Sequence, residues 1–176
     1  MSGLTPPVGP LDHAQGPAAA PATLVEYGDY ECPHCGAAYP MIKLLQQSLG
    51  DQLRFVFRNF PLSQAHEHAM RAAQAAEVAA VAGEAFFWRM HDQLFEHQDA
   101  LELNDLLGYA KAIGLDTARF RRDLEAGTFA VRVRSDFRGG VRSGVNGTPT
   151  FFINGERYDG DYTQAAIESA IRRTNR

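Results

Sequence analysis

An early strand–helix–strand pattern restricts the fold of this chain more than any other feature. TLVEY (23–27) and RFVFRNF (54–60) are rich in β-branched and aromatic residues, as expected of buried strands. Between them, Ile42, Leu45 and Leu49 recur at helical spacing, before a glycine that can end a helix. A strand, a helix and a strand of this length predict a βαβ unit with two parallel strands.

The middle of the chain has a different pattern. From residue 63 to residue 144 apolar residues recur almost throughout at helical spacing, and Asp116 is placed to cap one of these helices. We therefore divide the chain into three parts. They are an extended N-terminal arm rich in Pro, Gly and Ala (1–22), a domain formed by 23–62 and 145–176, and an inserted helical subdomain (63–144). The arm shows no clear strand.

The last part of the chain returns to strands. TFFI (150–153) and ERY (156–158) flank Asn154-Gly155, a dipeptide that favours a tight type I′ hairpin turn. Asp161 is expected to cap a final helix. Together with the early βαβ unit, this pattern predicts an α/β fold with one small mixed sheet, in the order β-α-β, several helices, β-β-α.

Composition and charge exclude several classes of protein. A net charge of −4 and an isoelectric point near 5.8 argue against a dedicated nucleic-acid binder. No apolar run approaches the roughly 18 residues that indicate a membrane span. The first 22 residues lack Lys, Arg and any apolar run, so we expect no signal peptide. The chain as given is expected in the cytoplasm, or outside it if a leader has been removed.

Both cysteines lie in ECPHCGAAYP (31–40), directly after the first strand and at the start of a predicted helix. Pro33 suits the first helical position, and the unpaired N–H groups at a helix start stabilise a thiolate at Cys32. Cys35 follows one helical turn later, within reach of the first sulfur. We therefore expect Cys32 to be an exposed nucleophile and Cys35 to resolve a mixed disulfide. A cationic His34 would stabilise the thiolate further.

Other uses of the cysteine pair remain open. A structural zinc site needs about four ligands, and the pair supplies two. His66 and His68 are candidates for the other two, but they are expected on opposite sides of a predicted helix. We therefore predict no metal. Inert buried thiols are the remaining possibility, which the position after a strand and at a helix start does not favour.

Two features elsewhere could assist thiol chemistry. Glu26 is a carboxylate in an apolar strand, six residues before Cys32. If buried, it would be costly unless paired or protonated, and it could then exchange protons with the thiols. It could equally be exposed on a strand edge. Thr148-Pro149 precedes the hairpin and its peptide bond could be cis, although most bonds to proline are trans.

Three parts of the sequence together resemble the DsbA-like branch of the thioredoxin superfamily. They are TLVEYGDYECPHC, GVNGTPTFFING and the helical stretch between them, so that the resemblance covers nearly everything after about residue 20. Pro33-His34 matches the active-site dipeptide of that branch. Glu26 falls on its buried acidic position. Thr148-Pro149 matches its cis-proline loop, which faces the disulfide and pairs with substrate backbone.

This resemblance implies a thioredoxin-like fold and a protein disulfide oxidoreductase. It implies protein or peptide thiols and disulfides as substrates, an unidentified redox partner and no bound cofactor. Whether such a site oxidises, reduces or isomerises depends on the redox poise of its compartment. The alternatives are a peptide-binding or chaperone-like module of the same fold, a metal-binding protein that uses Cys32 and Cys35, and a glutathione-using isomerase or transferase.

Overall fold

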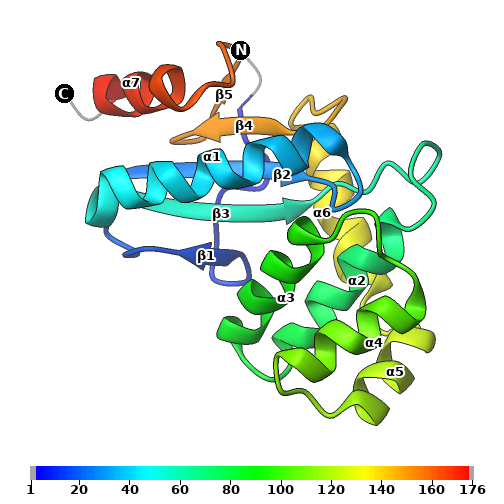
Figure 1. Cartoon of the computed structure of the whole chain (residues 1–176). Coiled ribbons are helices and arrows are strands. Elements are labelled where there is room, and N and C mark those ends of the chain that lie inside the picture. Colours follow the sequence, from blue (N-terminus) through cyan, green and yellow to red (C-terminus); the bar gives the residue numbers. More distant parts are fainter. Residues whose placement is uncertain (1–2, 175–176) are drawn as a thin grey trace.

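The computed structural model describes residues 3–174, and its centre is a mixed sheet with the strand order β1-β3-β2-β4-β5 (Figure 1). Among the strands of this described range, β2 and β3 are parallel and the other neighbouring pairs are antiparallel. The mixed α/β fold predicted from the sequence is therefore confirmed. The five strands are β1 (His13–Gln15), β2 (Ala22–Gly28), β3 (Leu53–Asn59), β4 (Thr150–Ile153) and β5 (Glu156–Tyr158).

The helices fall into two groups along the chain. The first connects or follows the strands: α1 (Pro33–Leu49), the short 3₁₀ turn η1 (Gly50–Gln52) and α7 (Gln164–Thr174). The second lies between β3 and β4, and α2 to α5 form a cluster at one end of the sheet (Figure 1). It comprises α2 (Ala69–Ala80), α3 (Glu84–Glu96), α4 (Leu103–Ala112), α5 (Thr117–Glu125) and α6 (Ala130–Arg142). Within the described range, no helix combines the length and the apolar character needed to cross a membrane.

The central strand β2 is buried on both faces. Successive side chains in a strand point to opposite sides. Leu24 belongs to the larger core, which includes α1, α7 and the helices α2 to α5. Val25 and Tyr27 belong to a smaller core on the other face, beside α6 and the N-terminal segment. Burial on both faces explains why this strand is almost continuously apolar, and it places Glu26 on the same side as Leu24 and α1.

Helix α6 passes close to the sheet because it contains two adjacent glycines. A Cβ atom on Gly140 would lie 2.6 Å from the ring of Phe60, and one on Gly139 would lie 3.3 Å from Pro6. Glycines weaken a helix in isolation. Here they give the space that lets α6 cover the second face of the sheet, which is why the predicted helix continues through both.

Several local predictions can be compared with the structure. Asp116 caps α5 by accepting a hydrogen bond from the N–H of Arg119, as predicted. Asn154 and Gly155 both have positive φ, 49° and 84°, as a type I′ turn requires. The expected cap at Asp161 is wrong. Instead, α7 begins at Gln164, and its first turn is capped by the hydroxyl of Thr163.

Two further local predictions are wrong. The N-terminal arm contains β1, which pairs with β3 and was not predicted because three residues are too few to show an alternating pattern. Helix α2 begins at Ala69, and residues 63–68 form turns instead of helix. The reason is a competing set of contacts, because Glu31 accepts a hydrogen bond from the N–H of His68, and Asp29 accepts one from the N–H of Leu62 directly before the segment.

Candidate active site

The two cysteines lie at the start of α1. Cys32 occupies the N-cap position with extended backbone, and Pro33 is the first helical residue. Both thiols are free. Cys35 is fully buried, whereas Cys32 keeps 4% of its surface exposed. The prediction of an exposed Cys32 is therefore wrong, because the residue is buried and the carbonyl oxygen of Thr148 lies 3.5 Å from its sulfur.

The two thiols differ strongly in acidity. A hydrogen bond from the Cys35 thiol, supported by the Thr148 side chain and the backbone N–H groups of Cys35 and His34, lowers the pKa of Cys32 to about 5. Burial raises the pKa of Cys35 well above its usual value, and its bond to Cys32 and the charge of Glu26 act in the same direction. At neutral pH Cys32 is therefore the thiolate and Cys35 the thiol.

Glu26 is buried on β2, beneath the start of α1. Only 2% of its surface is exposed, and its Oε1 atom has no hydrogen-bond partner among the described residues. Burial, followed by the charge of Cys32, raises the pKa of Glu26 to about 8. The alternative of an exposed edge residue is wrong, because β2 lies between β3 and β4. At neutral pH the carboxyl group is protonated, so it can donate a proton.

The loop before β4 faces the cysteines. The Thr148–Pro149 peptide bond is cis, and the carbonyl oxygen of Thr148 lies 3.5 Å from the Sγ atom of Cys32. Two segments 116 residues apart therefore meet at one sulfur. Thr148 and Pro149 of this loop line a groove together with His34 of the Cys-Pro-His-Cys motif.

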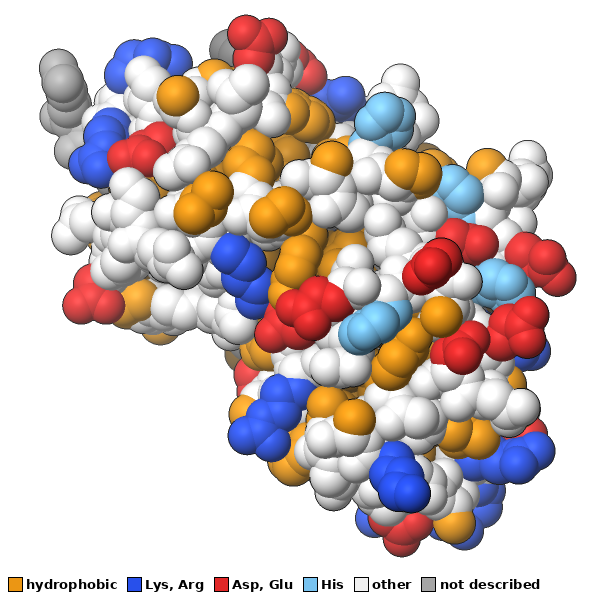
Figure 2. All heavy atoms as spheres, viewed as in Figure 1, with side chains coloured by type: hydrophobic (Ala, Val, Ile, Leu, Met, Phe, Trp, Pro, Cys, Tyr) orange, Lys and Arg blue, Asp and Glu red, His pale blue; other side chains and the backbone are white. Residues whose placement is uncertain are grey.

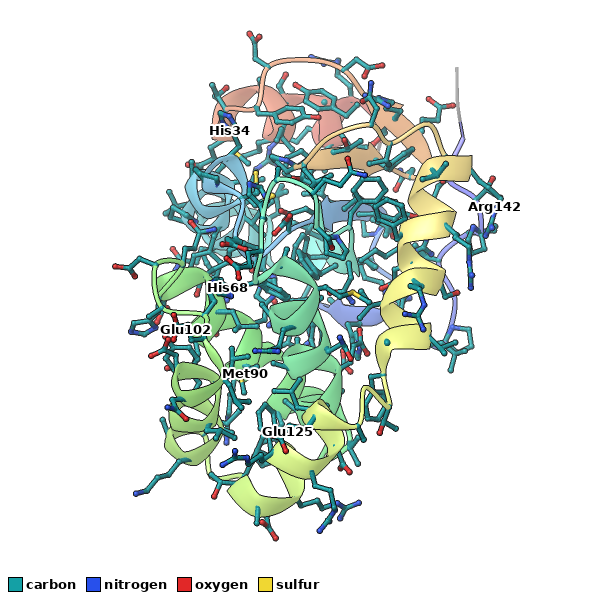
Figure 3. All side chains as sticks on the ribbon, turned by 90° about the vertical axis from the view of Figure 1, so that its right-hand side faces the viewer. His34, His68, Met90, Glu102, Glu125 and Arg142 are labelled. Atoms are coloured by element: carbon teal, nitrogen blue, oxygen red, sulfur yellow. The ribbon has the colours of Figure 1, made fainter. Side chains whose placement is uncertain are left out.

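This groove has a volume of 630 Å³ and runs between α1 and the start of α7. Figure 2 shows apolar side chains gathered on this face, over α1 and toward α7. His34 is exposed at one end of the groove, at the start of α1 (Figure 3). Its backbone N–H is one of the groups that lower the pKa of Cys32. The apolar lining comprises Ala37, Ala38, Pro40, Met41, Leu44, Pro149 and Tyr162.

Comparison with known proteins identifies the family to which this architecture belongs. A sequence model described as thioredoxin matches residues 10–173. The chain belongs to the thioredoxin family. Among curated relatives, the Na(+)/H(+) antiporter NhaA 1 of Salinispora arenicola is 47% identical over 169 residues, which are 96% of this chain and 26% of the relative. This thioredoxin-family chain thus spans about a quarter of the length of the curated relatives it matches.

Solved structures confirm the thioredoxin-like fold and the resemblance to DsbA-like proteins. BdbD from Bacillus subtilis, in its oxidised form, is 26% identical with a TM-score of 0.83, and the match covers 93% of this chain and 92% of that one. A thioredoxin-like oxidoreductase from Silicibacter pomeroyi is 27% identical with a TM-score of 0.81, over 94% and 92%. The thiol-disulfide exchange protein alpha-DsbA2 from Wolbachia pipientis shares the fold at 20% identity, with a TM-score of 0.80 over 92% and 86%.

Sequence reasoning missed Asp29, which organises the surroundings of the buried thiol in this thioredoxin fold. Its backbone N–H donates to the Sγ atom of Cys35 over 3.4 Å. Its carboxylate accepts from the N–H groups of Glu31 and Leu62, both at 2.8 Å, and contacts the imidazole of His66 at 2.8 Å. An Asp at a strand end, where side chains often bond backbone N–H groups two residues later, was the available indication.

His66 and His68, the candidates for further metal ligands, are not brought together with the cysteines at a metal site in the described part of the chain. The imidazole of His66 contacts Asp29, and the backbone N–H of His68 donates to a carboxylate oxygen of Glu31. His68 lies at the start of α2 (Figure 3). Across residues 3–174, no three His, Cys, Asp or Glu side chains gather in a way that could hold a metal ion.

Proposed function

We propose that this thioredoxin-family protein is a thiol–disulfide oxidoreductase that exchanges disulfides with protein substrates. Cys32 is its nucleophile and Cys35 its resolving thiol. The observation that carries the proposal is the difference in acidity between these two thiols of one Cys-Pro-His-Cys motif. A thiolate attacks disulfides and is a good leaving group, whereas a buried thiol of high pKa is reserved for the second step.

The acidity of Cys32 favours the oxidising direction. A stabilised thiolate stabilises the reduced form of the pair, which makes the disulfide form a stronger oxidant. A substrate thiolate would attack the Sγ atom of Cys32 in the disulfide form and break its bond to Cys35. Cys35 would leave with both bonding electrons and take a proton from Glu26, which burial keeps protonated at neutral pH.

A second substrate thiolate would then attack the substrate sulfur that is bound to Cys32. The Cys32 thiolate leaves, and the substrate has gained a disulfide and lost two electrons to the pair. An unidentified redox partner must remove these electrons before the next cycle. The groove beside Cys32 would hold the substrate through its apolar lining, and the loop at Thr148 and Pro149 would pair with the substrate backbone.

The proposal is tested by equilibrating the protein with glutathione and by supplying a reduced model protein with two cysteines. We expect catalysed disulfide formation and a reduction potential well above the roughly −270 mV of thioredoxin itself. A peptide-binding module with the same fold would give another result. It would bind unfolded peptides equally well after both thiols are alkylated, and it would not accelerate disulfide formation at all.

Glu26 should make stability depend on pH once the Cys32 thiolate is removed. In the Cys32→Ser protein burial, the larger of the two causes that raise the Glu26 pKa, is still present, so the folded state keeps the Glu26 proton well above the usual value of 4.5, near which the unfolded chain loses it. The folded state therefore binds more protons across this window, and stability should fall as the pH rises from about 5 to about 8. The expected loss is at most about 4 kcal/mol, the limit for one proton over three pH units, measured by urea unfolding at several pH values.

The matched control for this experiment is the double variant Cys32→Ser/Glu26→Gln. A neutral amide at position 26 cannot lose a proton, so its unfolding free energy should fall by less over the same window. Asp136 and His13, whose pKa values are also raised, titrate in both variants and cancel in the difference. If the two variants lost stability equally as the pH rose, Glu26 would not be the titrating group.

A further inference from the structure

Gln98 connects the active-site turn to a distant part of the chain. It lies between α3 and α4, and its exposure is intermediate. Its side-chain Nε2 group donates to the backbone carbonyl oxygen of Tyr30 over 2.9 Å and to that of Cys32 over 2.8 Å. These two carbonyls belong to the turn that leads from β2 into α1.

The glycine after the second cysteine gives Gln98 its space. A Cβ atom on Gly36 would overlap the Oε1, Cδ and Nε2 atoms of Gln98. Gly36 has ordinary helical backbone, so its lack of a side chain is needed for room and not for an unusual φ. Its own N–H donates to the Cys32 carbonyl over 3.0 Å. That carbonyl therefore accepts two hydrogen bonds, one from inside α1 and one from Gln98.

Holding α1 against α3 does not require Gln98. The hydroxyl of Tyr39 donates to Asp92 over 2.9 Å, and Lys43 forms an ion pair with the same carboxylate over 2.7 Å. The hydroxyl of Tyr30 and the buried His91 lie 3.0 Å apart. Gln98 instead bonds only carbonyls of the active-site turn, among the hydrogen bonds of the described residues.

We propose that Gln98 is a positioning residue for the nucleophile, and that it fixes the turn from which α1 starts and so the first N–H groups of α1 beside Cys32. The inference rests on the proposed function, because it concerns the same thiol. The N–H groups of His34 and Cys35 help to stabilise the thiolate, and they can do so only while α1 begins at Pro33. The two hydrogen bonds from Gln98 hold the carbonyl groups of Tyr30 and Cys32, which precede the start of α1.

Two substitutions break this contact from opposite sides. Gln98→Ala removes the donor, and Gly36→Ala displaces the Gln98 side chain without changing it. Each should raise the pH at which the Cys32 thiolate forms. This pH is measured from the ultraviolet absorbance of the thiolate. Each should also shift the equilibrium with glutathione toward the disulfide form by about threefold to tenfold, as expected for roughly one net hydrogen bond. The double variant should shift no further than either single one.

Gly108→Ala is the matched control, because it adds a methyl group within α4 where no other atom lies within 4 Å. It should leave the thiolate midpoint and the glutathione equilibrium unchanged. The inference is overturned if Gln98→Ala and Gly36→Ala lower thermal stability but leave the midpoint in place, which is the result of a purely structural role. Additive shifts in the double variant would also overturn it. If Gln98→Ala does not fold, the midpoint of thiolate formation in Gly36→Ala tests the inference by itself.

The midpoint is measured without a substrate, so this test separates the two proposals. A wild-type protein with an acidic Cys32 but no catalysed exchange would contradict the proposed function and leave the role of Gln98 intact. If the wild-type protein exchanges disulfides, but the midpoint of thiolate formation is unchanged in Gln98→Ala and Gly36→Ala, the role of Gln98 is contradicted and the proposed function stands.

Discussion

Replacing Cys32 with serine is expected to lower the rate of disulfide exchange at least about a thousandfold, since loss of a nucleophile removes the covalent step itself. A serine hydroxyl stays protonated at neutral pH and cannot form a mixed disulfide. The remaining thiol, Cys35, is fully buried and its pKa is raised by burial, so it cannot take over the attack. The rate is measured as oxidation of a reduced model protein.

Cys35→Ser is the matched variant, because it removes the other thiol and keeps the nucleophile. It should still form mixed disulfides at Cys32 but should not resolve them, so that covalent complexes accumulate and can be identified by mass. Cys35→Ala should also raise the pH at which Cys32 is alkylated, since the Cys35 thiol is the largest influence that lowers the Cys32 pKa to about 5. Undiminished exchange by the Cys32→Ser protein would rule out the assignment of the nucleophile.

The cysteine pair could be placed from the sequence because the features that position it are local. A strand, a proline at the first helical position and a helix occur within a few residues of Cys32, and α1 begins at Pro33. The sequence could not decide whether Glu26 is buried. An alternating pattern gives the face of a strand but not its place in the sheet, and β2 is central only because β3 and β4 pair with it.

The features that sequence analysis missed depend on contacts between distant segments. β1 is three residues long and is defined by its pairing with β3, about forty residues later. Asp29 contacts Leu62 and His66, which lie 33 and 37 residues later in the chain. No spacing rule links these positions. The division into a thioredoxin-like domain and a helical insertion, and the roles given to the site residues, stay predictions.

Replacing Arg58 with methionine should destabilise the protein by roughly 3–5 kcal/mol, as expected when one partner of a buried ion pair is removed. The side chain of Arg58 is 3% exposed and that of Asp12 is 8% exposed. Arg58 donates to both carboxylate oxygens of Asp12 over 2.8 and 2.9 Å. It also donates to the carbonyls of Pro6 and Pro7 and to the hydroxyl of Tyr27. Methionine would remove all of these bonds and leave the buried charge of Asp12 without its cation, with only the N–H of Gly9, among the described residues, still donating to it.

Arg121→Met is the matched control, because Arg121 pairs with Glu125 on the exposed face of α5. Its loss should cost no more than about 0.5 kcal/mol in urea unfolding. The double variant Asp12→Leu/Arg58→Met should recover part of the loss, because no unpaired charge remains buried. Equal costs for Arg58→Met and Arg121→Met would mean that the N-terminal segment is not part of the folded core. A large difference would instead show that the buried guanidinium group of Arg58 helps to fix this segment to the sheet, in addition to the pairing of β1 with β3.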